Sequence, residues 1–193
     1  MNELARCFLA VSLPGSLIEV VQAVQVDIKR RSGGGDVRWV GPEQFHITLC
    51  FLGEVSAAQI AAMQEPILSA CTSAHAMVLS LGKLSGFPNA VQPRIVTLEI
   101  EGASESLVTL QKSLATAVLP FAPGMDQKPF VPHLTLGRLK AESEMARTGI
   151  GRALRMVTVP PCPAFEVGHV QLIHTELGPS GPIYSVIRTF GLS

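Results

Sequence analysis

Hydrophobic and polar residues alternate in two short stretches of the chain that share a His-x-Thr motif. The stretches are residues 45–52 and residues 132–138. In the first, His46 and Thr48 occupy alternate positions between apolar residues, and His133 and Thr135 do the same in the second. Successive side chains of a β-strand point to opposite faces. Each stretch therefore predicts a strand that presents an imidazole and a hydroxyl on one face.

Further strands and helices are predicted along the rest of the chain. Apolar or alternating runs predict strands at residues 6–13, 37–40, 77–84, 94–100, 165–174 and 183–187. Apolar residues at helical spacing predict helices at about 17–30 and 57–70, and a third that starts at 104–106 and buries Leu107, Leu110, Leu114 and Val118. Residues 142–156 are polar and predict either a helix or a loose segment. Strands adjacent in sequence, mixed with helices, predict an α+β domain with antiparallel sheets.

Turn and capping residues predict where several of these elements end. Ser16 and Ser56 are the expected caps of the first two helices. Gly53 is expected to end the first His-x-Thr strand, residues 85–89 to form a loop, and residues 178–182 to form a hairpin turn. Each half of the chain has a helix, a loop and a His-x-Thr strand in the same order, which suggests two similar halves.

The length and composition fit one compact domain over residues 1–193, or two small lobes that share a sizeable core. Hydrophobic residues make up 47% of the chain and charged residues 16%, which argues against disorder. The 15 Lys and Arg residues balance the 15 Asp and Glu residues. A broad basic surface for nucleic acid is therefore not expected, although a local basic pocket is compatible with this balance.

The cysteines and the N-terminal residues bear on the cellular location. Four cysteines lie far apart and form no Cys-x-x-Cys motif, which predicts reduced, mostly buried thiols in a reducing compartment. The apolar run within residues 1–13 is broken by Arg6 and ends at Pro14. It is too short for a signal peptide or a membrane span, so a cytoplasmic protein without a membrane segment is expected.

The paired imidazoles and hydroxyls suit phosphodiester chemistry. Imidazole gives and takes protons near neutral pH, so one neutral histidine can take a proton from water while a charged one protonates a leaving oxygen. The attacking and leaving oxygens lie on opposite sides of phosphorus, which matches two opposed histidines. Thr48 and Thr135 would donate hydrogen bonds to the phosphate, and His⁺ or a nearby arginine would stabilise the developing charge.

Two other interpretations of the histidine pair stay open on the residues alone. His46 and His133 could be core residues that hydrogen-bond to their neighbouring threonines. They could also bind a metal ion, but neither motif contains Asp or Glu, and no Cys or further His completes a ligand set. The prediction is therefore an acid–base pair without a metal ion or other cofactor.

Four segments of the chain resemble the two-histidine (2H) phosphoesterases. The most similar branch is the RNA 2′,3′-cyclic phosphodiesterases of bacteria and archaea, historically called 2′-5′ RNA ligases. Residues 37–55, VRWVGPEQFHITLCFLGEV, resemble the first signature of this branch, and residues 129–138, PFVPHLTLGR, resemble the second. Residues 8–14 and 176–184 resemble its beginning and end. The resemblance covers nearly the whole chain.

The resemblance implies a fold, a reaction and a set of residue roles. The implied fold is bilobal with pseudo-two-fold symmetry, in which two antiparallel sheets form a central cleft and the helices lie outside. The implied reaction is metal-free hydrolysis of an RNA-terminal 2′,3′-cyclic phosphate to a 2′-phosphomonoester, with reversible 2′-5′ RNA ligation as a second reaction. On this analogy His46 is the general acid on the 3′ oxygen, His133 is the base for water, and Thr48 and Thr135 hold phosphate oxygens.

Three further residues carry two interpretations each. Arg138 matches a basic position of the family near the phosphate, but strict alternation would place it on the wrong face unless the strand contains a twist or a bulge. Otherwise it is a surface charge. Phe130 either stacks on the terminal base or belongs to the core. His174 stands where the family often has Arg or Lys, so it is either an outer-cleft residue or a structural one.

Two alternative functions use the same residues. The first is hydrolysis of a small cyclic nucleotide such as ADP-ribose 1″,2″-cyclic phosphate, which a deep closed pocket would favour. The second is an RNA-end-binding module that retains the histidine pair without turnover. The neutral net charge and the low content of aromatic residues count against the second alternative. A monomer is expected, because nothing in the sequence demands more.

Overall fold

The computed structural model of the protein describes residues 4–33, 37–140, 144–178 and 181–193. The strands are β1 (Leu4–Ser12), β2 (Val37–Trp39), β3 (His46–Ser56), β4 (Met77–Phe87), β5 (Ile95–Gly102), β6 (His133–Leu139), β7 (Phe165–Val167), β8 (His169–Gly178) and β9 (Gly181–Gly191). The helices are α1 (Gly15–Ser32), α2 (Ala57–Thr72), α3 (Ser104–Val118) and α4 (Glu144–Met156), with a short 3₁₀ turn, η1 (Pro42–Gln44).

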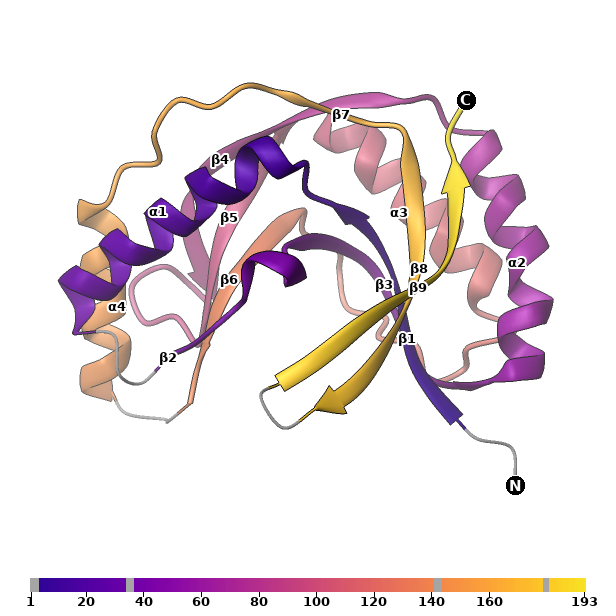
Figure 1. Ribbon diagram of the computed structural model, residues 1–193, viewed down its shortest axis with the longest axis horizontal. Helices are drawn as coiled ribbons and strands as arrows, with labels where there is room; N and C mark the ends of the chain where they lie inside the picture. Colours follow the sequence, from indigo (N-terminus) through magenta and orange to yellow (C-terminus); the bar gives the residue numbers. More distant parts are fainter. Residues whose placement is uncertain (1–3, 34–36, 141–143, 179–180) are drawn as a thin grey trace.

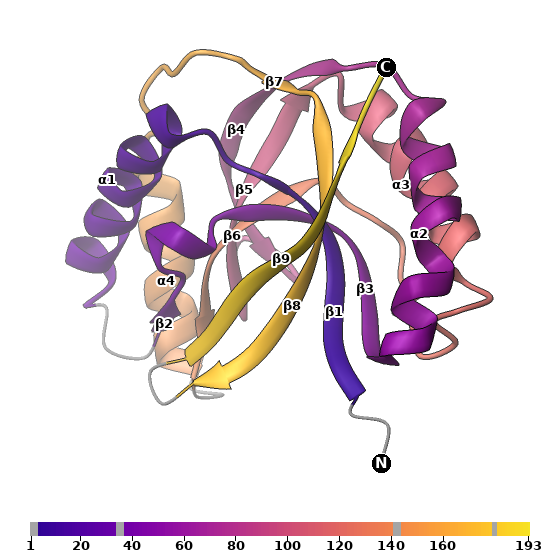
Figure 2. The same cartoon turned by 45° about the vertical axis from the view of Figure 1, so that its right-hand side comes forward.

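The strands form two antiparallel sheets. The first sheet has the order β3-β1-β8-β9 and the second has the order β2-β6-β5-β4-β7. Figure 2 shows the four strands of the first sheet side by side. Helices α2 and α3 lie beside the first sheet, and α1 and α4 lie beside the second (Figure 1). The α+β class, the two antiparallel sheets and the outer position of the helices confirm the predicted architecture.

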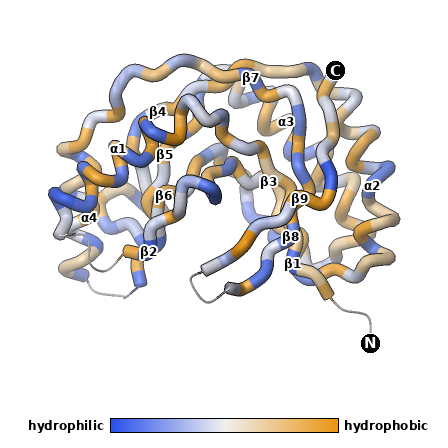
Figure 3. The backbone as a smooth tube through the Cα atoms, viewed as in Figure 1, coloured by the Kyte–Doolittle hydropathy of each residue, from blue (hydrophilic) through white to orange (hydrophobic). Residues whose placement is uncertain are grey.

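One face of each sheet packs against the helices in the main core, which leaves the other face available for a site. The main core contains side chains from both sheets and all four helices, including Leu9, Leu172 and Leu98. A second, smaller core lies on the other face of the first sheet and consists of Phe8, Ala10 and Ile173. The face of each sheet that is turned away from its helices is called the inner face below. Figure 3 shows hydrophobic and hydrophilic stretches alternating along the flanking helices.

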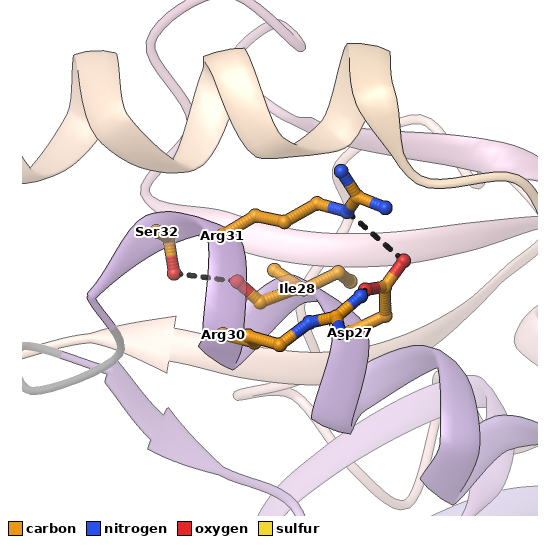
Figure 4. Close-up of polar contacts among 5 residues, drawn as sticks. All are labelled: Asp27, Ile28, Arg30, Arg31 and Ser32. Carbon is orange, nitrogen blue, oxygen red and sulfur yellow. Dashed lines mark hydrogen bonds and ion pairs between the residues drawn. The ribbon is translucent and has the colours of Figure 1, made fainter.

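Helix α1 is tied to the second sheet by a buried amide. Gln25 is 4% exposed, and its Nε2 donates hydrogen bonds to the carbonyl oxygens of Val40, at 2.9 Å, and Leu136, at 2.8 Å. At the end of α1, Asp27 forms ion pairs with Arg30 and Arg31, and Ser32 Oγ donates to the carbonyl of Ile28 (Figure 4). The basic residues in this last turn also stabilise the helix, because positive charge interacts favourably with the C-terminal end of the helix dipole.

Most predicted elements are confirmed. The third helix buries the four predicted residues Leu107, Leu110, Leu114 and Val118. Ser56 caps α2 by accepting a hydrogen bond from the backbone of Gln59, and the side chain of Gln59 returns to the Ser56 backbone. Residues 144–156 are helical, and β8 pairs with β9 as predicted. The expected turn at 178–182 includes residues outside those that the structure describes.

Several predicted ends are wrong for local reasons. Gly53 does not end β3, because its φ of 74° is accommodated inside the strand beside a register shift against β1. The loop expected at 85–89 begins later, since β4 continues to Phe87. The single strand predicted at 165–174 is two strands, and β7 and β8 on either side of Gly168 belong to different sheets. Ser16 does not cap α1, which follows Pro14 without a side-chain cap.

Candidate active site

The two His-x-Thr motifs lie on β3 and β6, which contact each other where the two sheets meet. His46 pairs with Ser12 and Thr48 pairs with Ala10 across β1. Residues directly opposite each other on antiparallel strands share a face. Because Ala10 belongs to the smaller core, His46 and Thr48 lie on the inner face of the first sheet.

His46 is held by a backbone carbonyl and two aromatic rings. Its Nδ1 lies 2.7 Å from the carbonyl oxygen of Gln44. The ring of Phe8 stacks on the imidazole with a centroid separation of 4.8 Å, and the ring of Tyr184 approaches it edge-on at 5.4 Å. Tyr184 also packs against Phe8 at 5.2 Å. The smaller core of the first sheet therefore fixes the orientation of this imidazole.

His133 has a matching environment in the second sheet. Its Nδ1 lies 2.7 Å from the carbonyl oxygen of Val131, which again is two residues earlier in the chain. The ring of Phe87 approaches the imidazole edge-on at 5.0 Å. Thr135 pairs with Thr97 and His133 pairs with Glu99 across β5. The two halves therefore position their histidines by the same kind of contacts.

The hydrogen bonds determine which ring nitrogen can react. A carbonyl oxygen can only accept a hydrogen bond, so Nδ1 of both His46 and His133 carries the proton. In the neutral state the lone pair is then on Nε2. Each imidazole thus presents Nε2 for proton transfer, while the backbone fixes the tautomer.

A β-bulge follows the motif on both strands. On β3, Thr48 pairs with Ala10 and Cys50 pairs with Leu9, so Leu49 is an extra residue. On β6, Thr135 pairs with Thr97 and Gly137 pairs with Val96, so Leu136 is the extra residue. A bulge shifts the alternation of side chains by one position. The residue five positions after each histidine is thereby brought to the inner face.

The bulge on β6 resolves the position of Arg138. Arg138 pairs with Ile95 on one side and with Arg38 on the other, and Ile95 pairs with Phe87 in turn. Phe87 contacts His133, so this row of residues lies on the inner face. The structure therefore contains the bulge that the sequence required for Arg138 to lie near the histidines. On β3, the equivalent position is Phe51, which is 46% exposed.

Burial and positive charge lower the pKa of both imidazoles in the free protein. Burial is the main cause that lowers the pKa of His46 to about 4, and the charges of Arg138 and His133 add to this effect. Burial is also the main cause that lowers the pKa of His133, again with a contribution from Arg138. The hydrogen bonds to the carbonyls of Gln44 and Val131 act in the opposite direction. The charge of Arg138 therefore acts on both imidazoles.

The sequence of the chain matches a known family over most of its length. Residues 14–179 match a family described as the 2'-5' RNA ligase superfamily. The chain belongs to this superfamily. A protein from Methanothermobacter thermautotrophicus, named RNA 2',3'-cyclic phosphodiesterase, is 31% identical over 97% of this chain and 98% of its own length. One with the same name from Archaeoglobus fulgidus is 31% identical over 96% of this chain and 99% of its own.

Solved structures show the same fold. A structure of a Thermus thermophilus protein has a TM-score of 0.78 with 27% sequence identity and covers 97% of both chains. The structure of Escherichia coli LigT complexed with 3'-AMP has a TM-score of 0.76 with 22% identity and covers 99% of both chains. The arrangement of two antiparallel sheets with outer helices is therefore shared with these solved structures.

The other sequence-predicted site residues lie in different surroundings. Phe130 is partly buried and packs against the main core, and its stacking on the terminal base stays a prediction. His174 pairs with Cys7, whose side chain belongs to the main core, so His174 lies on the face opposite to His46. Its Nδ1 lies 3.5 Å from Glu176 Oε1. His174 therefore lies away from the face that carries His46, and its assignment as a structural or an outer-cleft residue stays a prediction.

Three aromatic residues of the site were not predicted from the sequence: Phe8, Tyr184 and Phe87. Side-chain alternation along β1 places Phe8 on the same face as Ala10 and Ser12. It did not indicate that this face carries His46, since the pairing of β1 with β3 is a long-range contact. Among the described residues, no group of three or more His, Cys, Asp or Glu side chains could hold a metal ion.

Proposed function

We propose that this protein is an RNA 2′,3′-cyclic phosphodiesterase that hydrolyses a terminal 2′,3′-cyclic phosphate to a 2′-phosphomonoester. The observation that carries the proposal is the matched pair His46 and His133, each fixed through Nδ1 to a backbone carbonyl so that Nε2 is available. The family membership and the names of the two relatives that are 31% identical support this substrate class.

The proposed reaction needs one base and one acid. His133 Nε2 takes a proton from water as the water oxygen attacks phosphorus. The bond between phosphorus and the 3′ oxygen breaks, and the electron pair goes to that oxygen, which takes a proton from His46 Nε2. Thr48 and Thr135 donate hydrogen bonds to the phosphate oxygens, and Arg138 stabilises the charge that develops on them. In 2′-5′ ligation, the 5′ hydroxyl of a second RNA takes the place of water. It gives its proton to His133 Nε2 as its oxygen attacks phosphorus, and the 3′ oxygen leaves with a proton from His46 Nε2 as before.

The proposal explains how an imidazole with a lowered pKa can act as an acid. The free protein favours neutral imidazoles, because burial and Arg138 both oppose a further positive charge. A cyclic phosphate carries a negative charge, which favours the protonated form of a nearby histidine. Binding of the substrate thus raises the pKa of the acid and prepares the ionisation state that the reaction uses.

A product analysis tests the proposed function. A short RNA with a 2′,3′-cyclic phosphate end is incubated with the protein in excess EDTA, and phosphorus NMR identifies the product. Wild type should form the 2′-monophosphate, while His46→Ala and His133→Ala should lower the rate by about 10²- to 10⁴-fold, as expected for loss of a general acid or base. The matched control is His169→Ala, which removes an exposed histidine at the start of β8. A 3′-phosphate product, or full activity in both variants, would overturn the proposal.

The location and oligomeric state rest on the sequence. No helix in the described part of the chain is long and apolar enough to span a membrane. The expected cytoplasmic location and monomeric state remain predictions. Cys7, Cys50 and Cys71 are buried free thiols and Cys162 is partly buried, which fits the expectation of mostly buried cysteines.

A further inference from the structure

Three arginines, Arg6, Arg38 and Arg138, lie around Tyr184. Arg38 and Arg138 lie directly opposite each other on β2 and β6. Arg6 lies in a row with Thr175 on β8 and Tyr184 on β9, so all three share the inner face of the first sheet. Two strand spacings separate Arg6 from Tyr184, which corresponds to roughly 10 Å between their Cα atoms.

The edges of the two sheets meet at this place. Gln44, which ends the 3₁₀ turn after β2, donates a hydrogen bond from Nε2 to the carbonyl of Pro182 at the start of β9. Both β2 and β9 are edge strands. This contact brings Arg38 from one sheet toward Tyr184 from the other. The charges of arginines from both sheets act on Tyr184, and its ring lies against His46.

The arginines at the end of α1 form ion pairs with a carboxylate, whereas the three arginines around Tyr184 form none with the residues that the structure describes. Arg30 and Arg31 share the carboxylate of Asp27 (Figure 4). In contrast, no ion pair within the described ranges involves Arg6, Arg38 or Arg138, although Glu54 lies opposite Arg6 on β3. Adjacent guanidinium groups repel each other unless an anion lies between them. A phosphate is a suitable anion, because the guanidinium fork matches two of its oxygens.

The electrostatic effects separate the arginines into two groups. The charge of Arg138 lowers the pKa of both histidines, so Arg138 belongs with the reacting phosphate. Burial raises the pKa of Tyr184, and the charges of Arg138, Arg38 and Arg6 oppose this rise. Arg38 and Arg6 are not among the causes that shift the pKa of His133 or His46. The charges of these two arginines therefore act on Tyr184, and Arg38 lies opposite Arg138 on the neighbouring strand.

We propose that Arg6, Arg38 and the Tyr184 hydroxyl form a second anion subsite, which binds the phosphate on the 5′ side of the terminal nucleotide. The inference rests on the proposed function, because it takes the reacting phosphate to lie between the histidines. It deepens that function by specifying the substrate as an RNA strand with at least one phosphodiester before its cyclic end. The ribose and base of the terminal nucleotide then span the distance between the two subsites.

Three synthetic substrates test the subsite with wild-type protein. They are adenosine 2′,3′-cyclic phosphate, the same compound with a 5′-phosphate, and the dinucleotide ApA with a 2′,3′-cyclic phosphate end. The 5′-phosphate should raise kcat/KM by at least about tenfold, and the dinucleotide should retain this gain. Equal kcat/KM on the first two substrates would overturn the subsite. The proposed function would survive that result, since all three substrates would still be hydrolysed, and would fail separately if none were.

Three variants identify the residues of the subsite. Arg38→Gln and Arg6→Gln should each remove most of the gain from the 5′-phosphate, and Tyr184→Phe should remove part of it while it keeps the ring against His46. On a longer single-stranded RNA, loss of one arginine contact should also make the slope of log affinity against log salt shallower by about 0.7. Arg155→Gln, an exposed arginine in the last turn of α4, is the matched control and should change neither quantity. Parallel losses on all three substrates would overturn the assignment.

A diphosphate could present the same chemistry from a small nucleotide. ADP-ribose 1″,2″-cyclic phosphate therefore forms a further arm of the experiment. If RNA is the substrate class, kcat/KM should be higher for the dinucleotide than for this compound. A higher value for the ADP-ribose derivative, with the same dependence on Arg6 and Arg38, would overturn RNA as the substrate class.

Discussion

Protonation of the His46 imidazole should change the unfolding free energy by an amount large enough to measure. Burial is the main cause that lowers its pKa from 6.5 to about 4. This fall corresponds to roughly 3 kcal/mol, because each pH unit is worth about 1.4 kcal/mol. The unfolded chain binds this proton more tightly than the folded chain does. The stability contributed by the neutral imidazole is therefore present above about pH 6.5 and is lost as the pH falls toward about 4.

Urea unfolding of wild type and His46→Asn measures this coupling. Asparagine removes the titrating group but can keep an N–H donor near the Gln44 carbonyl. Between about pH 7.5 and pH 4, wild type should lose roughly 3 kcal/mol more unfolding free energy than the variant loses. His133 is present in both proteins, so its own contribution cancels in the difference.

The same experiment can refute the reasoning. If the two proteins lose the same unfolding free energy within about 1 kcal/mol, burial does not disfavour the charged imidazole as the structure implies. An NMR titration of the His46 ring in the folded protein provides a direct check. A pKa near the ordinary value of 6.5 would contradict the account, whereas a low value that rises when inorganic phosphate is added would support it.

Three further substitutions test the site and its support. Thr135→Val should lower kcat/KM by roughly 10- to 100-fold with little change in urea midpoint, because it removes a hydrogen bond to a charged phosphate; unchanged kinetics would remove Thr135 from the site. Gln25→Leu should cost about 2 kcal/mol in urea unfolding, because it leaves two carbonyls without their donor, and a neutral effect would contradict that contact. Gly137→Ala should cost about 1–3 kcal/mol, because the new Cβ would lie 2.7 Å from Val37 Cγ1. Adding Val37→Ala to Gly137→Ala should relieve part of that strain. If the double variant instead loses the sum of the two single losses in unfolding free energy, the contact with Val37 is not the cause of the destabilisation.

Local sequence patterns predicted the elements but not all of their boundaries. The apolar stripe of α3 and the Ser56 cap were predictable because helical periodicity and capping are properties of adjacent residues. Gly168 was not predicted as a boundary, because alternation continues through it while the chain passes from one sheet to the other. Alternation of apolar and polar residues predicts a half-buried strand, but it does not predict which sheet the strand joins.

The candidate site divides in a similar way. His46, Thr48, His133 and Thr135 were predictable because each pair lies within one strand. Tyr184 was not, because its contact with His46 depends on the pairing of β9 with β8 and on the hydrogen bond between Gln44 and Pro182. Long-range register of this kind is fixed by packing rather than by any local pattern.

The division of work between the two histidines is most directly tested by a change in the leaving group. Replacing the bridging 3′ oxygen of the cyclic phosphate by sulfur gives a thiolate, which leaves without a proton from a general acid. On this substrate, His46→Ala should recover most of the wild-type rate, and His133→Ala should remain slow because water still needs a base. Recovery of His133→Ala instead would reverse the two roles, and recovery of neither variant would contradict acid–base catalysis by this pair.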